Sequence, residues 1–143
     1  MPGSNNPRPD GVPLHNMDIT VRWGDMDALG HVNNIMYFRF FETVRLAWFE
    51  QLGYAPLGEG DEGIVIVDNH AEYLEPVVYP AELQVRMGGH SLGRSSFVST
   101  YTITVGDKLT TRGSSRIVWV NNREMKSMPL PEKILQLLGS EKS

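Results

Sequence analysis

The sequence of 143 residues contains no cysteine. This absence excludes a disulfide framework, a thiolate nucleophile and every zinc site that needs cysteine ligands. Long apolar runs are missing too, because Arg39, Glu42 and Arg45 interrupt the most apolar stretch, residues 35–49. A membrane-spanning helix needs about 20 consecutive apolar residues. We therefore expect no membrane segment, and we expect any chemistry to use oxygen and nitrogen groups.

Charge of one sign is not in large excess. The chain has 13 basic and 17 acidic side chains, a net charge of −4, so we expect no general nucleic-acid partner. Residues 1–85 hold 4 basic and 13 acidic side chains, a net of −9, whereas residues 86–143 hold 9 basic and 4 acidic, a net of +5. The basic second part could accept phosphates. The 4 histidines lack metal-ligand spacing, so no metal site is predicted.

Length and composition predict one domain with a single core. Residues 1–16 are rich in Pro, Gly and Asn and lack the apolar run of a signal peptide, so we expect a flexible N-terminal segment. We expect the domain to occupy residues 17–138, followed by a tail at 139–143. Without a signal or an anchor, a cytoplasmic location is predicted.

Periodicity predicts a strand, a long helix and then further strands. Residues 18–23 alternate as in a half-buried strand, and a helix begins near Ile35 with Asn33 or Asn34 as its N-cap. Gly53 is a natural C-terminal stop. Apolar residues surround most of the helix, so we expect it to be buried nearly all round. Four more strands and a short amphipathic helix are predicted at 64–74, 81–90, 95–105, 109–120 and 132–138. Continuous apolar runs at 64–67 and 117–120 are typical of strands covered on both faces, by the helix or by a partner.

Two motif matches fail on their context. Residues 58–63 have the glycine spacing of a dinucleotide fingerprint, but they precede a predicted strand and carry three acidic side chains that would repel phosphate. Residues 89–93 match a nucleophile elbow, but no histidine follows Ser91 to complete a triad in that order. We interpret the two stretches as an acidic loop and a hairpin turn.

The segment from Trp23 to Asn34 is the best candidate for chemistry. Asp25 and Asp27 are two residues apart, which in extended backbone would place both carboxylates on one side. The following helix start presents free N–H groups and a partial positive charge. An Asp that activates an attacking oxygen and N–H groups that stabilise an oxyanion suit acyl transfer. The alternative is that these Asp and Asn side chains only form turns and caps.

The run RWGDMDALGHVNNIMYFRFFETVRLAWFEQLG, residues 22–53, resembles hotdog-fold acyl-CoA thioesterases of the 4-hydroxybenzoyl-CoA thioesterase type. The resemblance implies an α+β hotdog fold, in which a five-stranded antiparallel sheet wraps around one long central helix, with a short C-terminal helix. It also implies a cofactor-free acyl-CoA thioesterase that forms a homodimer or homotetramer, with its site at the subunit interface.

The resemblance also assigns roles to single residues. Asp27 corresponds to the catalytic carboxylate, either nucleophile or general base, and the backbone N–H of Asn34 would polarise the thioester carbonyl. Glu42 is the runner-up base, with an ion pair to Arg45 or Arg39 as its alternative. Supporting roles in the loop fall to Asp25, Gly30, His31 and Asn33. Binding of CoA falls to Arg94, Ser95 and Ser96, with Arg116, Arg123 and Lys126 as alternative phosphate ligands.

Two other functions stay open at this point. One is a non-catalytic hotdog module that binds acyl-CoA or acyl-carrier protein. The other is a hotdog dehydratase, which is less favoured because neither His31 nor His70 lies in a matching context. The sequence does not fix the length of the acyl chain or a preference for aromatic over aliphatic acyl groups.

Overall fold

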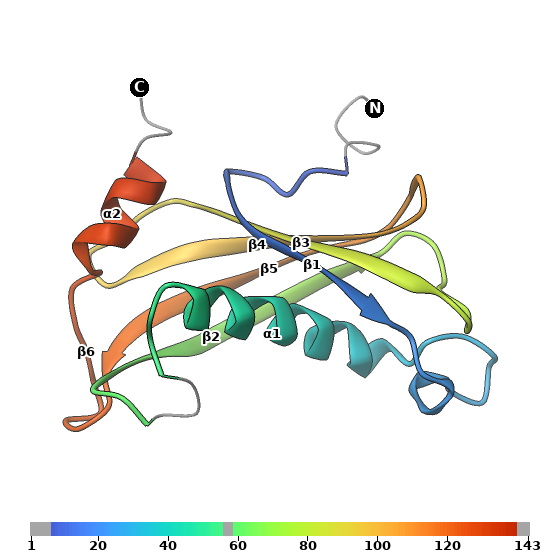
Figure 1. Cartoon of the computed structure of the whole chain (residues 1–143), viewed down its shortest axis with the longest axis horizontal. Coiled ribbons are helices and arrows are strands. Elements are labelled where there is room, and N and C mark those ends of the chain that lie inside the picture. The colour runs from blue at the N-terminus through green and yellow to red at the C-terminus, as the bar shows by residue number, and fades with distance from the viewer. Residues whose placement is uncertain (1–6, 56–58, 140–143) are drawn as a thin grey trace.

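The computed structural model describes residues 7–55 and 59–139. Its elements, in chain order, are β1 (Val12–Thr20), the 3-10 turn η2 (Trp23–Asp25), α1 (Asn34–Gln51), β2 (Glu62–Tyr73), β3 (Glu82–His90), β4 (Ser96–Val105), β5 (Lys108–Asn121), β6 (Lys126–Ser127) and α2 (Glu132–Gly139). Helix α1 lies along one face of the sheet, and α2 lies at the end of the sheet where α1 finishes (Figure 1).

All strand pairs are antiparallel, and the order across the sheet is β1-β3-β4-β5-β2. This arrangement confirms the predicted α+β hotdog class with one long helix and a short C-terminal helix. The predicted number of five strands is wrong, because Lys126 and Ser127 pair with β5 and make a sixth. A strand of two residues is too short to show an alternating pattern in the sequence.

The first strand begins at Val12 rather than Asp18 and ends at Thr20. Its first half therefore lies within the segment that we expected to be a flexible lead-in, and Asn16 pairs with Arg86 of β3. The strand is at the edge of the sheet and has a register shift next to Pro13, the kind of position where proline is tolerated. The remaining terminal residues, 1–6 and 140–143, and Gly58 of the rejected motif lie outside the described residues.

Helix α1 starts as predicted, because the Asn33 side chain accepts a hydrogen bond from the Ile35 N–H and caps the helix. The expectation that α1 is buried nearly all round is wrong for the single chain. Its seven buried side chains share one face, whereas Ile35 is 74% exposed and Glu42 is also exposed. The sheet of one chain covers only one side of a helix, so the other apolar positions remain in contact with solvent.

A cluster of aromatic rings packs where α1 ends. Trp48 contacts the rings of Phe97 and Trp119 with centroid distances of 5.8 and 6.4 Å, and Phe49 lies 5.5 Å from Trp119. Edge-to-face ring pairs at such distances are favourable beyond their buried area. This cluster anchors the C-terminal half of α1 to β4 and β5.

The β2 edge of the sheet is more exposed than its apolar sequence predicts. Val65 and Val67 on β2 are 46% and 56% exposed, whereas Ile117 and Trp119 on β5 are fully buried. The run at 64–67 is therefore covered on one face only by this chain. No helix among the described residues is both long and apolar enough to cross a membrane.

Candidate active site

The segment around Asp27 forms a tight hairpin, which we call the Asp27 hairpin (residues 26–32). Met26 and Val32 form an antiparallel bridge at its base, and the Asp27 N–H donates to the carbonyl of His31 at 2.9 Å. Gly30 has φ = +89°, a left-handed conformation that glycine adopts without strain, in agreement with the predicted turn. Asp27 Oδ1 accepts the Leu29 N–H at 2.9 Å. One carboxylate oxygen of Asp27 is thus used to fix the turn.

Asp25 has a different role from Asp27. It lies in the 3-10 turn η2, which breaks the extended backbone assumed in the sequence argument, and it is only 4% exposed. Its Oδ2 accepts the Arg22 N–H at 2.9 Å, and its Oδ1 lies 3.5 Å from the Arg22 guanidinium. The Asp25 carbonyl accepts the Asn33 N–H at 2.9 Å. Asp25 therefore closes the base of the loop.

The first turn of α1 has an unused donor. Asn33 accepts the N–H groups of both Ile35, through its side chain, and Met36, through its carbonyl. No acceptor for the Asn34 N–H is found within residues 7–55 and 59–139. The Tyr73 hydroxyl donates to the Asn34 carbonyl at 3.2 Å, so this contact does not use the Asn34 N–H. A free donor at the start of an 18-residue helix is suited to stabilise negative charge.

Two cavities flank the Asp27 hairpin. The Asp27 cavity has a volume of about 390 Å³ and is lined by Trp23, Gly24, Met26, Asp27, Gly30 and Tyr79. The Asn34 cavity has a volume of about 310 Å³ and is lined by His31, Val32, Asn34, Tyr37, Tyr73, Leu74, Glu75 and Pro76. The structure thus places the two predicted catalytic groups in neighbouring cavities rather than in one.

An electrostatic effect links the two cavities. Burial raises the pKa of Tyr37 above its ordinary value, a hydrogen bond with the Val77 backbone lowers it, and the nearby charges of Tyr73 and Asp27 raise it further. The charge of Asp27 therefore reaches a phenol that lines the Asn34 cavity.

Several residues that line these cavities escaped the sequence analysis. Tyr73 and Tyr79 belong to β2 and to the connection from β2 to β3, about 50 residues after Asp27 in the chain. That connection is tied to the hairpin, since Val32 donates to the Val77 carbonyl at 2.7 Å and the Tyr79 N–H approaches the Met26 sulfur at 3.4 Å. No local motif marks these tyrosines. Their only signal in the sequence is an unusual density of aromatic and apolar residues next to prolines.

Glu42 lies apart from both cavities, on the exposed side of α1. Neither predicted ion pair of Glu42 is present among the described residues. Arg45 is buried instead, and its guanidinium donates to the Tyr101 hydroxyl at 2.9 Å. The i,i+3 spacing on a helix permitted an ion pair between Glu42 and Arg45, but the Arg45 side chain is buried in the core instead.

The predicted CoA-binding residues Arg94, Ser95 and Ser96 lie at the other end of the sheet. The Arg94 carbonyl accepts the Leu130 N–H at 2.9 Å, and the Ser96 hydroxyl lies 3.4 Å from the Arg116 guanidinium. They follow β3, whose nine residues span about 27 Å, whereas the Asp27 hairpin lies near the beginning of β3 (Figure 1). A single chain therefore does not bring Arg94 and Asp27 together.

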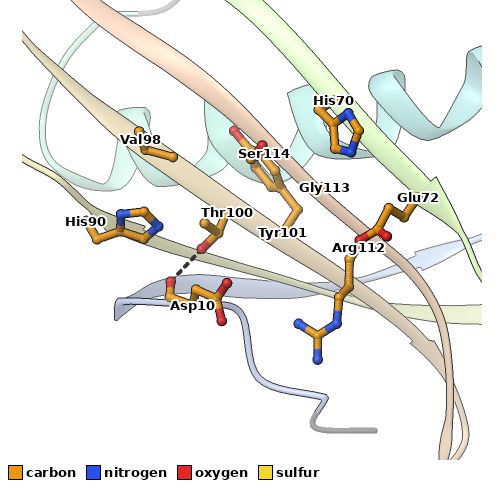
Figure 2. A pocket seen from close by; sticks show the side chains of 10 residues that line it. All are labelled: Asp10, His70, Glu72, His90, Val98, Thr100, Tyr101, Arg112, Gly113 and Ser114. Atoms are coloured by element: carbon orange, nitrogen blue, oxygen red, sulfur yellow. Dashed lines mark hydrogen bonds between the residues drawn. The ribbon is translucent and has the colours of Figure 1, made fainter. Parts of the chain in front are cut away.

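A further cavity of about 260 Å³ lies on the sheet face opposite α1 (Figure 2). His70, Glu72, His90, Arg112 and Asp10 are among the side chains that line it. Within the described ranges, no three His, Asp or Glu side chains gather closely enough to hold a metal ion. Two of the histidines are thus placed away from the Asp27 hairpin.

Comparison with known proteins assigns the family and agrees with the fold. Residues 21–138 match the model of the thioesterase-like superfamily, so the chain belongs to that family and is a thioester hydrolase. The PA2801 protein of Pseudomonas aeruginosa is 40% identical, with a TM-score of 0.81, over 87% of this chain and 97% of its own.

Two further solved structures extend the comparison. A Thermus thermophilus thioesterase complexed with coenzyme A and Zn is 30% identical, with a TM-score of 0.78, over 90% of this chain and 98% of its own. A DHNA-CoA thioesterase from Staphylococcus aureus, 21% identical with a TM-score of 0.76 over 90% and 94% of the two chains, shares the fold.

Proposed function

We propose that the protein hydrolyses acyl-CoA thioesters to a carboxylic acid and free CoA, with Asp27 as nucleophile or general base. As a base, Asp27 takes a proton from water while the water oxygen attacks the carbonyl carbon. The carbon–sulfur bond then breaks, and the CoA thiolate takes up the proton. As a nucleophile, the carboxylate displaces CoA and water hydrolyses the resulting anhydride. In both cases negative charge develops on the carbonyl oxygen.

The observation that carries the proposal is the unused Asn34 N–H at the start of α1. A preorganised donor at a helix N-terminus stabilises an oxyanion without reorganisation during the reaction. Asp27 precedes this donor by seven residues in the chain, and its Oδ1 is fixed by the Leu29 N–H. Asp25, Gly30, His31 and Asn33 hold the loop that positions both groups. Glu42 remains a weaker candidate base, because it lies away from both cavities.

We place the phosphate-bearing part of CoA near Arg94, Ser95 and Ser96 of a second copy of the chain. Support comes from the separation of the two ends of the sheet, the exposed face of α1 and the exposed Val65 and Val67 on β2. A homodimer or homotetramer would bring the Arg94 end of one copy to the Asp27 end of another. A light-scattering mass of one chain at assay concentration would contradict this part of the proposal.

The oxyanion role has a direct test in Asn34→Pro. Proline is favoured at the first position of a helix, where it removes only the N–H, and Asn33 already has the extended backbone that precedes proline. We expect kcat for thiol release from a panel of acyl-CoAs to fall about 10²–10³-fold. Asn34→Ala is the matched control, because it keeps the N–H and should keep most of the activity.

Equal activity of Asn34→Pro and Asn34→Ala would count against the oxyanion role of the Asn34 N–H. Tight binding of acyl-CoA with no thiol release by the wild-type chain would instead favour the non-catalytic binding module.

A further inference from the structure

Tyr37 lies in the first turn of α1, three residues after Asn34. Residues three apart on a helix are neighbours on one side of it. A helical side chain also points back toward the N-terminus of its helix and covers the preceding turn. The Tyr37 ring is therefore directed toward the start of α1, where the Asn34 N–H has no acceptor among the described residues.

The accessible part of Tyr37 faces the Asn34 cavity. Tyr37 is only 2% exposed, yet it lines that cavity together with Asn34 and Tyr73. The Tyr73 ring meets the Tyr37 ring edge to face, with 5.0 Å between the centroids and 66° between the planes. The Phe40 ring lies 6.0 Å away on the same helix. Close packing holds a buried ring in one orientation, so the phenol is a fixed part of the cavity wall.

The Tyr37 hydroxyl has a donor that the chain does not use. Its hydrogen bond with the Val77 backbone lowers the pKa of the phenol, which identifies the phenol oxygen as the acceptor of the Val77 N–H. The Val77 carbonyl in turn accepts the Val32 N–H at 2.7 Å, so Val77 is itself held in place. A phenol has one O–H donor besides its capacity to accept. Within residues 7–55 and 59–139, no acceptor for this O–H is found.

The electrostatic surroundings keep this phenol protonated. Burial raises the pKa of Tyr37 above its ordinary value, and the nearby charges of Tyr73 and Asp27 raise it further. Glu75 is the one carboxylate among the residues that line the Asn34 cavity, and it lies 3.4 Å from the Lys108 ammonium. At neutral pH the cavity therefore offers a neutral O–H donor beside the N–H of the helix start.

We propose that the Tyr37 hydroxyl is a second oxyanion donor, which binds the thioester carbonyl oxygen together with the Asn34 N–H. This inference rests on the proposed function, because it adds a donor at the place where that function puts the carbonyl. The phenol donates a hydrogen bond and keeps its proton, so no bond of Tyr37 breaks whether Asp27 acts as base or as nucleophile. Two preorganised donors on one oxygen stabilise its negative charge more than one donor does.

Tyr37→Phe removes this donor and keeps the ring. We expect kcat for thiol release from the panel of acyl-CoAs to fall about 10²-fold, the usual effect of losing one oxyanion donor. KM should change little, because the hydrogen bond strengthens as charge develops in the transition state. Tyr54→Phe is the matched control. It removes a phenol hydroxyl at the other end of α1, where Tyr54 stacks on Phe49, and it should leave kcat unchanged.

An inert analogue tests the same contact without turnover. In a ketone analogue of an acyl-CoA, a methylene replaces the thioester sulfur, so the carbonyl is kept and no thiol can leave. Infrared spectroscopy of an isotope-labelled carbonyl reports its hydrogen bonds, because each donor lowers the C=O stretching frequency. We expect this frequency to rise in Tyr37→Phe and in Asn34→Pro, and to keep its wild-type value in Tyr54→Phe.

An unchanged kcat or an unchanged carbonyl frequency in a folded Tyr37→Phe chain would overturn the inference. If Asp27→Asn and Asn34→Pro slow hydrolysis but Tyr37→Phe does not, this inference alone fails. A wild-type chain that releases no thiol would contradict the proposed function instead. The frequency difference between the wild type and Tyr37→Phe would still decide whether the phenol contacts the bound carbonyl, and an analogue that does not bind would contradict both proposals.

Discussion

The two ends of α1 differ in how completely the chain covers them. At the C-terminal end, Trp48 is 2% exposed within a cluster of rings, and the Lys133 ammonium of α2 donates to the Leu52 carbonyl at 2.9 Å. At the N-terminal end, Trp23, Leu29 and Ile35 are 77%, 79% and 74% exposed, next to two cavities. The first end is closed by packing, and the second is exposed in the single chain.

Under the proposed mechanism, this difference separates stability from function along one helix. Burial of large aromatic side chains contributes several kcal/mol, so the closed end anchors α1. At the open end, backbone and side-chain hydrogen bonds hold Asp27 and the start of α1 over a base of buried residues that includes Asp25 and Val32. Changes at the two ends should therefore have effects of different kinds.

The largest expected effect is that of Asp27→Asn at the open end. The amide oxygen can still accept the Leu29 N–H, so the hairpin should persist, but the side chain can no longer act as base or nucleophile. We expect turnover to fall about 10²–10⁴-fold with an unchanged melting temperature. Thiol-release kinetics measure the turnover, and calorimetry measures the melting temperature. An unchanged turnover would remove Asp27 from the mechanism.

Trp48→Ala should show the opposite behaviour at the closed end. Loss of a buried Trp leaves a cavity between Phe97 and Trp119, and we expect the free energy of unfolding to fall by about 3–5 kcal/mol. Denaturant unfolding measures this loss. The matched change at the open end, Trp23→Ala, should cost about 0.5 kcal/mol or less because that side chain is exposed. Equal losses for the two tryptophans would contradict the comparison.

Lys133→Met should have a smaller effect on the closed end. The ammonium lies 4.7 Å from the centre of the Tyr54 ring and donates to the Leu52 carbonyl just after α1. Both contacts are exposed, so we expect a loss of about 0.5–1 kcal/mol in unfolding free energy. High salt should reduce the difference from the wild type, whereas a salt-independent loss would point to packing alone.

The smallest expected effect is on the titration of Tyr37 at the open end. Its raised pKa means that the folded chain keeps this phenol neutral at a pH where the unfolded chain, with a value near 10.0, ionises it. The resulting stabilisation is fully present below pH 10 and is lost as pH rises through the higher folded pKa.

Tyrosinate absorbance, compared between the wild type and Tyr37→Phe, reports this pKa. Asp27→Asn should move it slightly downward, because the Asp27 charge contributes to the raised value. No change with Asp27→Asn would place the carboxylate out of reach of the Asn34 cavity.

Much of the fold could be predicted because its signals are local. The Asn33 cap, the turn at Gly30 and the alternation within β3 each depend on residues a few positions apart. The exposed face of α1 could not be predicted, because an apolar side chain on a helix does not specify whether the same chain or another molecule covers it. The two-residue β6 was missed because its pairing with β5, rather than any pattern of its own, defines it.

The sequence by itself determined the chemistry that is possible: no thiol, an Asp in a tight turn, and a capped helix a few residues later. Tertiary structure decided what surrounds that chemistry. Pairing of β2 with β5 and of β3 with β1 brings Tyr73 and Tyr79 to the hairpin and leaves Arg94 at the far end of the sheet. Packing of α1 on the sheet buries Arg45 against Tyr101 of β4. The physical reason is the separation of the interacting residues along the sequence. Capping and turn hydrogen bonds form between residues a few positions apart, whereas these contacts depend on strand pairing between distant segments.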